Sequence, residues 1–97
     1  MSISVTYDPV KRRLTLSWRG LDFDDAPLVF EGRTLRLEDT RYDYGERRYV
    51  TVGRLRGRMV VIVWTPRGNA RHVISMRKAN DREETRFAKR LKEGEGP

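Results

Sequence analysis

The sequence contains no cysteine and a single histidine, His72, among its 97 residues. Without cysteine there is neither a disulfide framework nor a thiolate metal site, and one imidazole is too few for a histidine-based metal centre. No apolar run approaches the ~20 residues that cross a membrane, and the opening MSISVTYDP lacks the charged start and apolar core of a signal peptide. We therefore expect a cytoplasmic protein without a membrane partner, a metal or any other cofactor.

Several motifs that mark enzymes and DNA-binding domains are also missing. The chain has no P-loop, dinucleotide-binding glycine pattern, zinc motif or nucleophile elbow, and its GRLRG segment at residues 53–57 is better explained as a hairpin turn. It shows neither helix-turn-helix spacing nor a zinc finger, which argues against sequence-specific DNA recognition.

Positive charge is in excess, and the excess is confined to the second half of the chain. Lys and Arg number 21 against 14 Asp and Glu, a formal net charge of +7. Residues 1–45 hold seven basic and eight acidic side chains, whereas residues 46–97 hold 14 basic and six acidic ones. Most of the cations are arginine, whose planar guanidinium suits bidentate phosphate contact. This favours a polyanionic partner such as RNA, although a solvated basic surface would have the same composition.

The most apolar stretch predicts the central strand of a sheet. Met59–Trp64 is six consecutive apolar residues, four of them β-branched, which is typical of a strand buried on both faces. Pro66, Gly68 and Asn69 then predict a chain reversal, and residues 71–77 a returning strand.

Alternation along the returning strand sorts its side chains into two groups. One face carries two guanidiniums and a hydroxyl, and the opposite face is mostly apolar. The members are Arg71, Val73, Ser75 and Arg77 on the first face, and His72, Ile74 and Met76 on the second.

The remaining pattern predicts further strands and an α+β domain over residues 1–92. Alternating residues predict an edge strand over 3–7 and a strand over 34–38, and residues 47–52 form the next one. We expect residues 93–97 to be a disordered tail.

Helices are less clearly specified. Residues 10–21 fit both helical spacing and strand alternation, and the residues alone leave the choice open. A short helix is predicted to end before Gly32. It begins at Asp22, where a capping pattern is present, or at Asp25, because Pro27 would clash with the preceding turn of a helix that starts at Asp22. A C-terminal helix starts after Asn80 with a thin apolar stripe and runs to about residue 91.

Several blocks of this sequence resemble the BrnT family over about residues 3–90. They are YDPVK at 7–11, GLDFDDA at 20–26 leading to VF at 29–30, DYGE at 43–46, TVG at 51–53, WTPRG at 64–68 and RHVISMRKA at 71–79. The resemblance implies a RelE-like α+β fold, with a mainly antiparallel sheet, two N-terminal helices and one C-terminal helix. The first of these helices would lie between Asp8 and Gly20.

The resemblance also implies a ribonuclease toxin of a type II toxin-antitoxin pair that halts translation. The implied partners are RNA and a ribbon-helix-helix antitoxin called BrnA. One assembly that the resemblance implies is a dimer of toxin-antitoxin heterodimers.

The implied activity selects the candidate catalytic residues. Metal-free RNA cleavage needs a base for the 2′-hydroxyl, cations for the pentavalent phosphorane and an acid for the departing 5′-oxygen. The candidates are Arg71, Ser75, Arg77, His72 and Glu46. Each also has an ordinary interpretation: strand arginines facing solvent, a packed histidine, and a glutamate paired with a neighbouring arginine.

A second group of candidates would hold the RNA without reacting. Lys11 matches the Asp-Pro-x-Lys position of the family, and tyrosines of residues 42–49 offer rings for base stacking. The RNA-binding candidates are Lys11, Arg48, Arg67, Lys78 and Tyr44.

The sequence also departs from the family pattern and leaves other functions open. Many members have Asn where this chain has Thr15, and Lys-His where it has Trp18-Arg19. Loss of that histidine favours an alternative, a non-catalytic RNA-binding or antitoxin-binding module with the same fold. A third interpretation, an enzyme for a small anionic substrate, would require a deep polar pocket.

Overall fold

The computed structural model describes residues 3–93 as an α+β fold built on one mixed five-stranded sheet. The strands are β1 (Val5–Tyr7), β2 (Leu35–Glu38), β3 (Tyr49–Leu55), β4 (Arg58–Arg67) and β5 (Ala70–Lys78). Their spatial order is β1-β5-β4-β3-β2, and only the β1–β5 pair is parallel. The apolar run predicted to be central therefore lies in the middle strand, β4. This strand continues through Pro66, so the turn to β5 is shorter than expected.

The helices are α1 (Pro9–Arg19), α2 (Ala26–Phe30) and α3 (Asp81–Glu93). The Asp8 side chain accepts a hydrogen bond from the backbone N–H of Val10, and Gly20 ends α1 in the left-handed region with φ of 68°. The ambiguous stretch is thus a helix. Its pattern was unclear because α1 has no buried side chain.

The entry to α2 follows the later of the two predicted starts. A short 3-10 turn (Phe23–Asp25) is capped by Asp22, and α2 begins only at Ala26, with Pro27 in its first turn. In the first turn of α2 the N–H that proline lacks would have no partner within the helix, so proline is tolerated there.

Two faces of the sheet result from alternation along β3, β4 and β5, and we name them after the helix packed on each. The α2 face carries the larger core: Leu21, Phe23, Ala26, Val29, Phe30, Leu55, Val60, Ile62, Trp64, Val73 and Met76. The α3 face carries a smaller core: Leu35, Val52, Met59, Val61, Phe87 and Leu91. The α3 face also includes Val50, Val63, Thr65, His72, Ser75 and Arg77.

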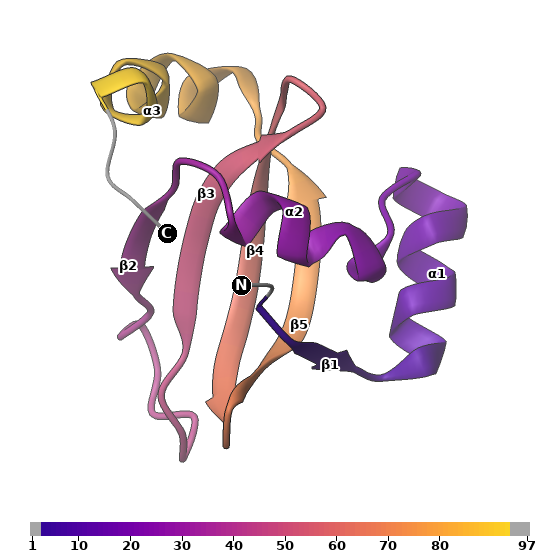
Figure 1. The fold of residues 1–97 in the computed structure, drawn as a ribbon. Coiled ribbons are helices and arrows are strands. Elements are labelled where there is room, and N and C mark those ends of the chain that lie inside the picture. Colours follow the sequence, from indigo (N-terminus) through magenta and orange to yellow (C-terminus); the bar gives the residue numbers. More distant parts are fainter. Residues whose placement is uncertain (1–2, 94–97) are drawn as a thin grey trace.

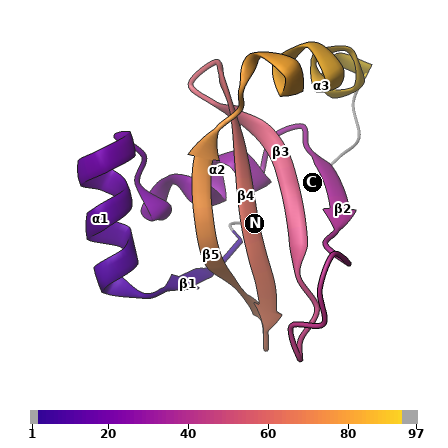
Figure 2. The same cartoon turned by 180° about the vertical axis from the view of Figure 1, so that it is seen from behind.

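The helices cover these faces unequally. In Figure 1, α2 crosses the front of the sheet and α1 stands beside β5. Viewed from behind, α3 lies at one end of the sheet and leaves most of the α3 face without a helix over it (Figure 2). This uncovered part is where the polar side chains of β5 are displayed.

Gly53 lies inside β3, so the predicted hairpin over residues 53–57 is too long, and the turn occupies only residues 56–57. A Cβ at Gly53 would stand 2.7 Å from Cγ1 of Val29 on α2, so the helix approaches the strand too closely for a side chain. We expect Gly53→Ala to lower the free energy of unfolding by about 1–3 kcal/mol in urea titration, because the α2 contact is overpacked. Gly32→Ala is the control, since its Cβ would make only ordinary contacts of 3.6 and 3.8 Å. Equal stability of the two variants would contradict this explanation.

The C-terminal helix ends at Glu93, which the sequence had assigned to the disordered tail. Residues 94–97 of that predicted tail lie outside the described residues. Within residues 3–93, no helix is long and apolar enough to cross a membrane.

Candidate functional site

A bulge in β5 changes which side chains share a face. Val63 pairs with Ser75, but the next residue of β4, Trp64, pairs with Val73. Ile74 is therefore an extra residue, and such an insertion shifts the alternation by one.

The predicted faces of β5 are corrected accordingly. Ser75 and Arg77 belong to the α3 face, whereas Arg71 belongs to the α2 face, opposite to them. His72 pairs with Thr65 on the α3 face and does not share a face with Met76. The bulge thus brings the histidine to the same side as Ser75 and Arg77 and removes one of the two predicted arginines.

Arg71 is used structurally on the α2 face. Its guanidinium carbon lies 4.3 Å from the ring centroid of Trp64 and 4.6 Å from that of Phe30. Burial, with a smaller contribution from the charge of Arg36, lowers the pKa of Arg71. Lys78 pairs with Val60 at the end of β5 and also lies outside the group of residues described next.

His72 is held in place by the edge strand. Thr6 on β1 pairs with His72 in the parallel register, and its Oγ1 lies 2.8 Å from Nδ1 of the imidazole. Nε2 is therefore the ring nitrogen left for a ligand. Partial burial, followed by the charge of Arg67, lowers the pKa of His72 below its ordinary value, although the charge of Glu46 opposes this. The imidazole is consequently neutral near pH 7 and suited to accept a proton.

Glu46 lies between two arginines close to this histidine. Its carboxylate is 3.8 Å from Nε of Arg48 and 3.9 Å from Nη2 of Arg67. The guanidinium of Arg48 stacks over the ring of Tyr44 at 4.0 Å. Its buried Nε has no hydrogen-bond acceptor among the described residues. Positive charge therefore exceeds negative charge here, which suits an anionic ligand.

Asp39 anchors the loop that carries Tyr44 and Glu46. Its carboxylate is only 2% exposed, accepts two hydrogen bonds from the Arg41 side chain at 2.9 and 3.0 Å, and accepts a third from the Tyr44 hydroxyl at 3.2 Å. These donors lower the pKa of Asp39 to about 2, so the anchor is ionised at neutral pH. The loop also contains Gly45 at φ of 72°, a conformation that favours glycine.

Arg77 is tied to α3 by Glu83. Its two terminal nitrogens donate to the two carboxylate oxygens at 2.7 and 2.8 Å, a bidentate pair. Glu83 also accepts from the backbone N–H of Asn80, and Asn80 accepts from that of Glu83, so one carboxylate closes the capping box and holds the arginine. The Arg77 hydrogen bonds lower the pKa of Glu83 to about 2.

The pH dependence of this contact is predictable. The pKa of Glu83 falls from 4.5 to about 2 on folding. The contribution of its ionised carboxylate to the free energy of unfolding is therefore complete above pH 4.5 and is lost as the pH drops toward 2. We expect Glu83→Gln to lower the free energy of unfolding by about 1 kcal/mol at pH 7, and the difference from the parent protein to shrink at pH 3. Urea titrations at pH 7, 4.5 and 3 measure both. A constant difference would show that the ionised carboxylate is not responsible.

We call the uncovered polar group on and around the α3 face the α3-face cluster. It contains eight of the ten sequence candidates: Lys11, Tyr44, Glu46, Arg48, Arg67, His72, Ser75 and Arg77. Sequence reasoning missed Thr6, Asp39 and Glu83, which orient members of the cluster. The start of the C-terminal helix after Asn80 was predicted, but nothing local indicated the contact of Glu83 with Arg77. Among residues 3–93, no three His, Cys, Asp or Glu side chains are grouped as a metal site would require.

One protein-family model matches this chain, over residues 7–83, a span that contains every member of the α3-face cluster. The family is described as the ribonuclease toxin, BrnT, of type II toxin-antitoxin systems. No curated protein matches the chain.

Proposed function

Because the chain belongs to the BrnT family of ribonuclease toxins of type II toxin-antitoxin systems, we propose that it cleaves RNA at the α3-face cluster without a metal ion and so inhibits translation. The family implies RNA as the substrate and an antitoxin as the partner. The observation on which the proposal rests is that the single histidine shares one sheet face with several arginines, in a part of that face over which no helix lies.

The finer assignments form part of the same proposal. The fold is RelE-like, the antitoxin is a BrnA-like ribbon-helix-helix protein, and two toxin-antitoxin heterodimers associate in the cytoplasm. Support for them comes from the resemblance of the sequence blocks to the family.

In the proposed reaction His72 acts as the general base. The neutral imidazole, in the tautomer whose Nδ1–H donates to Oγ1 of Thr6, accepts the 2′-hydroxyl proton at Nε2. The 2′-oxygen then attacks phosphorus, and the bond to the 5′-oxygen breaks. The departing oxygen takes its proton from solvent or from Lys11, whose charge acts on His72.

Arginine side chains stabilise the charge that develops on the phosphorane. Arg77 lies on the same face as Ser75, and its two terminal nitrogens leave Glu83 for the phosphate when RNA binds. Arg67 lies within electrostatic reach of His72. A guanidinium fixed before the reaction stabilises a phosphorane more than the ground-state phosphate, which has less charge. Glu46 keeps Arg48 and Arg67 in position, and Ser75 donates its hydroxyl to a phosphate oxygen.

One observation favours a second function, a non-catalytic module that binds RNA or the antitoxin. Arg77 is already occupied by Glu83 in a bidentate contact. If this contact persists when RNA is bound, the cluster lacks one of its main cations for the reaction. It then binds RNA or the antitoxin without cleaving RNA.

The direct test is cleavage of a labelled RNA by the purified protein in the presence of a chelator. Cleavage with the chelator present supports a metal-independent ribonuclease, and cleavage only after a divalent metal is added contradicts it. If purified RNA stays intact, the same assay in a translating extract separates a toxin that requires the ribosome from the non-catalytic module.

A further inference from the structure

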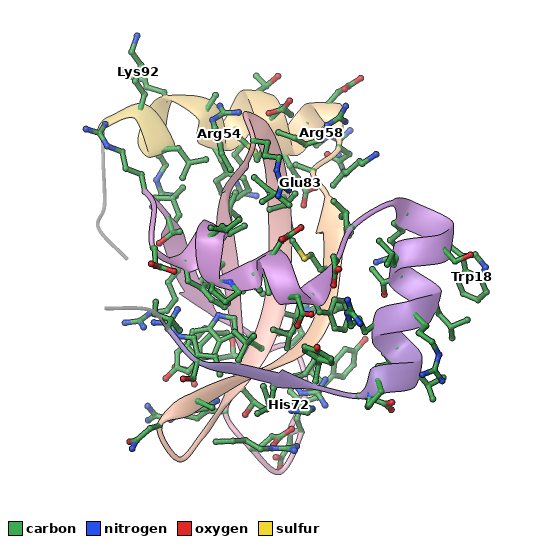
Figure 3. All side chains as sticks on the ribbon, turned by 45° about the vertical axis from the view of Figure 1, so that its right-hand side comes forward. Trp18, Arg54, Arg58, His72, Glu83 and Lys92 are labelled. Atoms are coloured by element: carbon green, nitrogen blue, oxygen red, sulfur yellow. The ribbon has the colours of Figure 1, made fainter. Side chains whose placement is uncertain are left out.

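The first helix shows an unusual apolar surface. Its four large apolar side chains are all at least 40% exposed: Val10, Leu14, Leu16 and Trp18. Trp18 is the extreme case at 77%, and Figure 3 shows its ring extending from α1 into solvent. A helix that buries no side chain of its own leaves this surface available for a ligand.

A trough separates α1 from the neighbouring edge of the sheet. β1 pairs only with residues 71–73 of β5, so the later part of β5 borders α1 instead of another strand. Two adjoining hollows of about 250 and 400 Å³ lie there and share Trp18 and Arg19 in their walls. Arg19 spans the trough by donating from Nη1 to the carbonyl oxygen of Met76 at 2.9 Å. We call this feature the edge trough.

The charges of the edge trough have one sign. Its charged lining residues are Lys11, Arg19, Arg77 and Lys78, all cations. Among the described residues, only Arg77 of these four forms an ion pair with a carboxylate. Its occupant should therefore be an anion.

The trough is continuous with the α3-face cluster. Lys11 and Ser75 line one hollow, Arg77 lines the other, and all three also belong to the cluster. A polyanion bound at the cluster can therefore extend along β5 into the trough. An exposed indole beside such a path is the side chain on which unpaired nucleobases stack.

We propose that the edge trough binds an unpaired stretch of RNA adjoining the scissile phosphate, with one base stacked on Trp18 and neighbouring phosphates on Arg19 and Lys78. This rests on the proposed ribonuclease function and adds a preference for single strands. A base inside a duplex has both faces covered by its neighbours, so it cannot stack on the indole. An acidic peptide also matches the positive charge of the edge trough, but its binding would not require the trough to be continuous with the α3-face cluster.

Tryptophan fluorescence provides the test, because the two tryptophans differ in environment. Trp64 is 3% exposed and donates to the Thr51 hydroxyl in the core, whereas Trp18 is 77% exposed. The probe is a short single-stranded RNA with every 2′-hydroxyl methylated, which removes the attacking group, together with the same sequence as a duplex. We expect the single strand to quench the fluorescence of the parent protein and the duplex to bind at least several-fold more weakly.

Variants show whether the ring is responsible. We expect Trp18→Ala to weaken single-strand binding about tenfold or more, and Trp18→Phe to stay within about threefold of the parent protein. Leu16→Ala is the matched control, since Leu16 is an exposed apolar residue of the same helix and does not line the trough. It should bind as the parent does. Binding to the variants is followed by fluorescence anisotropy of a labelled strand, which needs no tryptophan signal.

Two outcomes overturn the proposal. If Trp18→Ala binds the single strand as well as the parent does, and instead weakens binding of the antitoxin, the surface is a protein-docking site. If the duplex binds as tightly as the single strand, stacking is not involved. Either outcome leaves the proposed function standing when the parent cleaves RNA. A parent protein that does not bind the single strand refutes the trough proposal, and one that also cleaves no RNA in a translating extract refutes the proposed function as well.

Discussion

Substituting Arg77 by alanine is expected to lower the rate of RNA cleavage by about 10²- to 10³-fold, the loss typical for one fixed donor to an oxyanion. In the proposed reaction the two terminal nitrogens of Arg77, which donate to Glu83 in the protein without RNA, turn to the non-bridging phosphate oxygens. The variant should also relieve growth arrest when the chain is expressed alone. Rates on a labelled RNA, with folding checked by circular dichroism, measure the effect.

The matched control lies on the same strand and the opposite face. Arg71 was an equal candidate in the sequence, but it packs on the rings of Trp64 and Phe30. Arg71→Ala should therefore lower the free energy of unfolding by about 0.5–1 kcal/mol and leave the cleavage rate of the folded protein within about threefold. Loss of cleavage equal to that of Arg77→Ala would contradict the face assignment.

Replacing His72 by alanine is expected to slow cleavage by about 10²- to 10⁴-fold, because the reaction loses its general base. The pH profile of the parent protein supplies the signature. Since burial lowers the pKa of His72 below 6.5, the imidazole is neutral above that pKa, and activity should fall only as the pH drops through a midpoint below 6.5. Rates between pH 4.5 and 8 test this.

The Thr6→Val variant distinguishes the role of His72 as the base from the role of Thr6 in positioning it. It removes the hydroxyl that contacts Nδ1 and leaves the imidazole in place, so cleavage should fall by less than it does in His72→Ala. An unchanged pH midpoint in a slow His72→Ala variant would assign the titration to another group and remove His72 from the role of base.

Much of the fold could be predicted from the sequence because its signals are local. The unbroken apolar run of β4 predicts a middle strand without reference to any other segment. The helix between Asp8 and Gly20 followed only from the family resemblance. The interior of α1 was ambiguous for a physical reason. Its apolar side chains do not face a core, so their spacing is free of the constraint that produces a helical stripe.

The site was less predictable because it depends on contacts between distant residues. The bulge at Ile74 decides which arginine joins His72, yet no local turn residue marks it. The contacts of Thr6 with His72 and of Arg77 with Glu83 depend on strand pairing and helix docking. Gly53 appeared to be a turn residue, but the close approach of Val29 on α2 requires it. The residue types therefore indicated the kind of chemistry, and the tertiary structure determined which residues contact one another in the site.

The most direct test of metal-independent cleavage at the α3-face cluster is the chemistry of the RNA ends produced by the purified protein in the presence of a chelator. Attack by the internal 2′-oxygen predicts 2′,3′-cyclic phosphate and 5′-hydroxyl ends, identified by mass spectrometry. It also predicts no cleavage where the 2′-hydroxyl is methylated. Ends bearing a 3′-hydroxyl and a 5′-phosphate, or cleavage that stops when the chelator is added, would contradict the proposed mechanism.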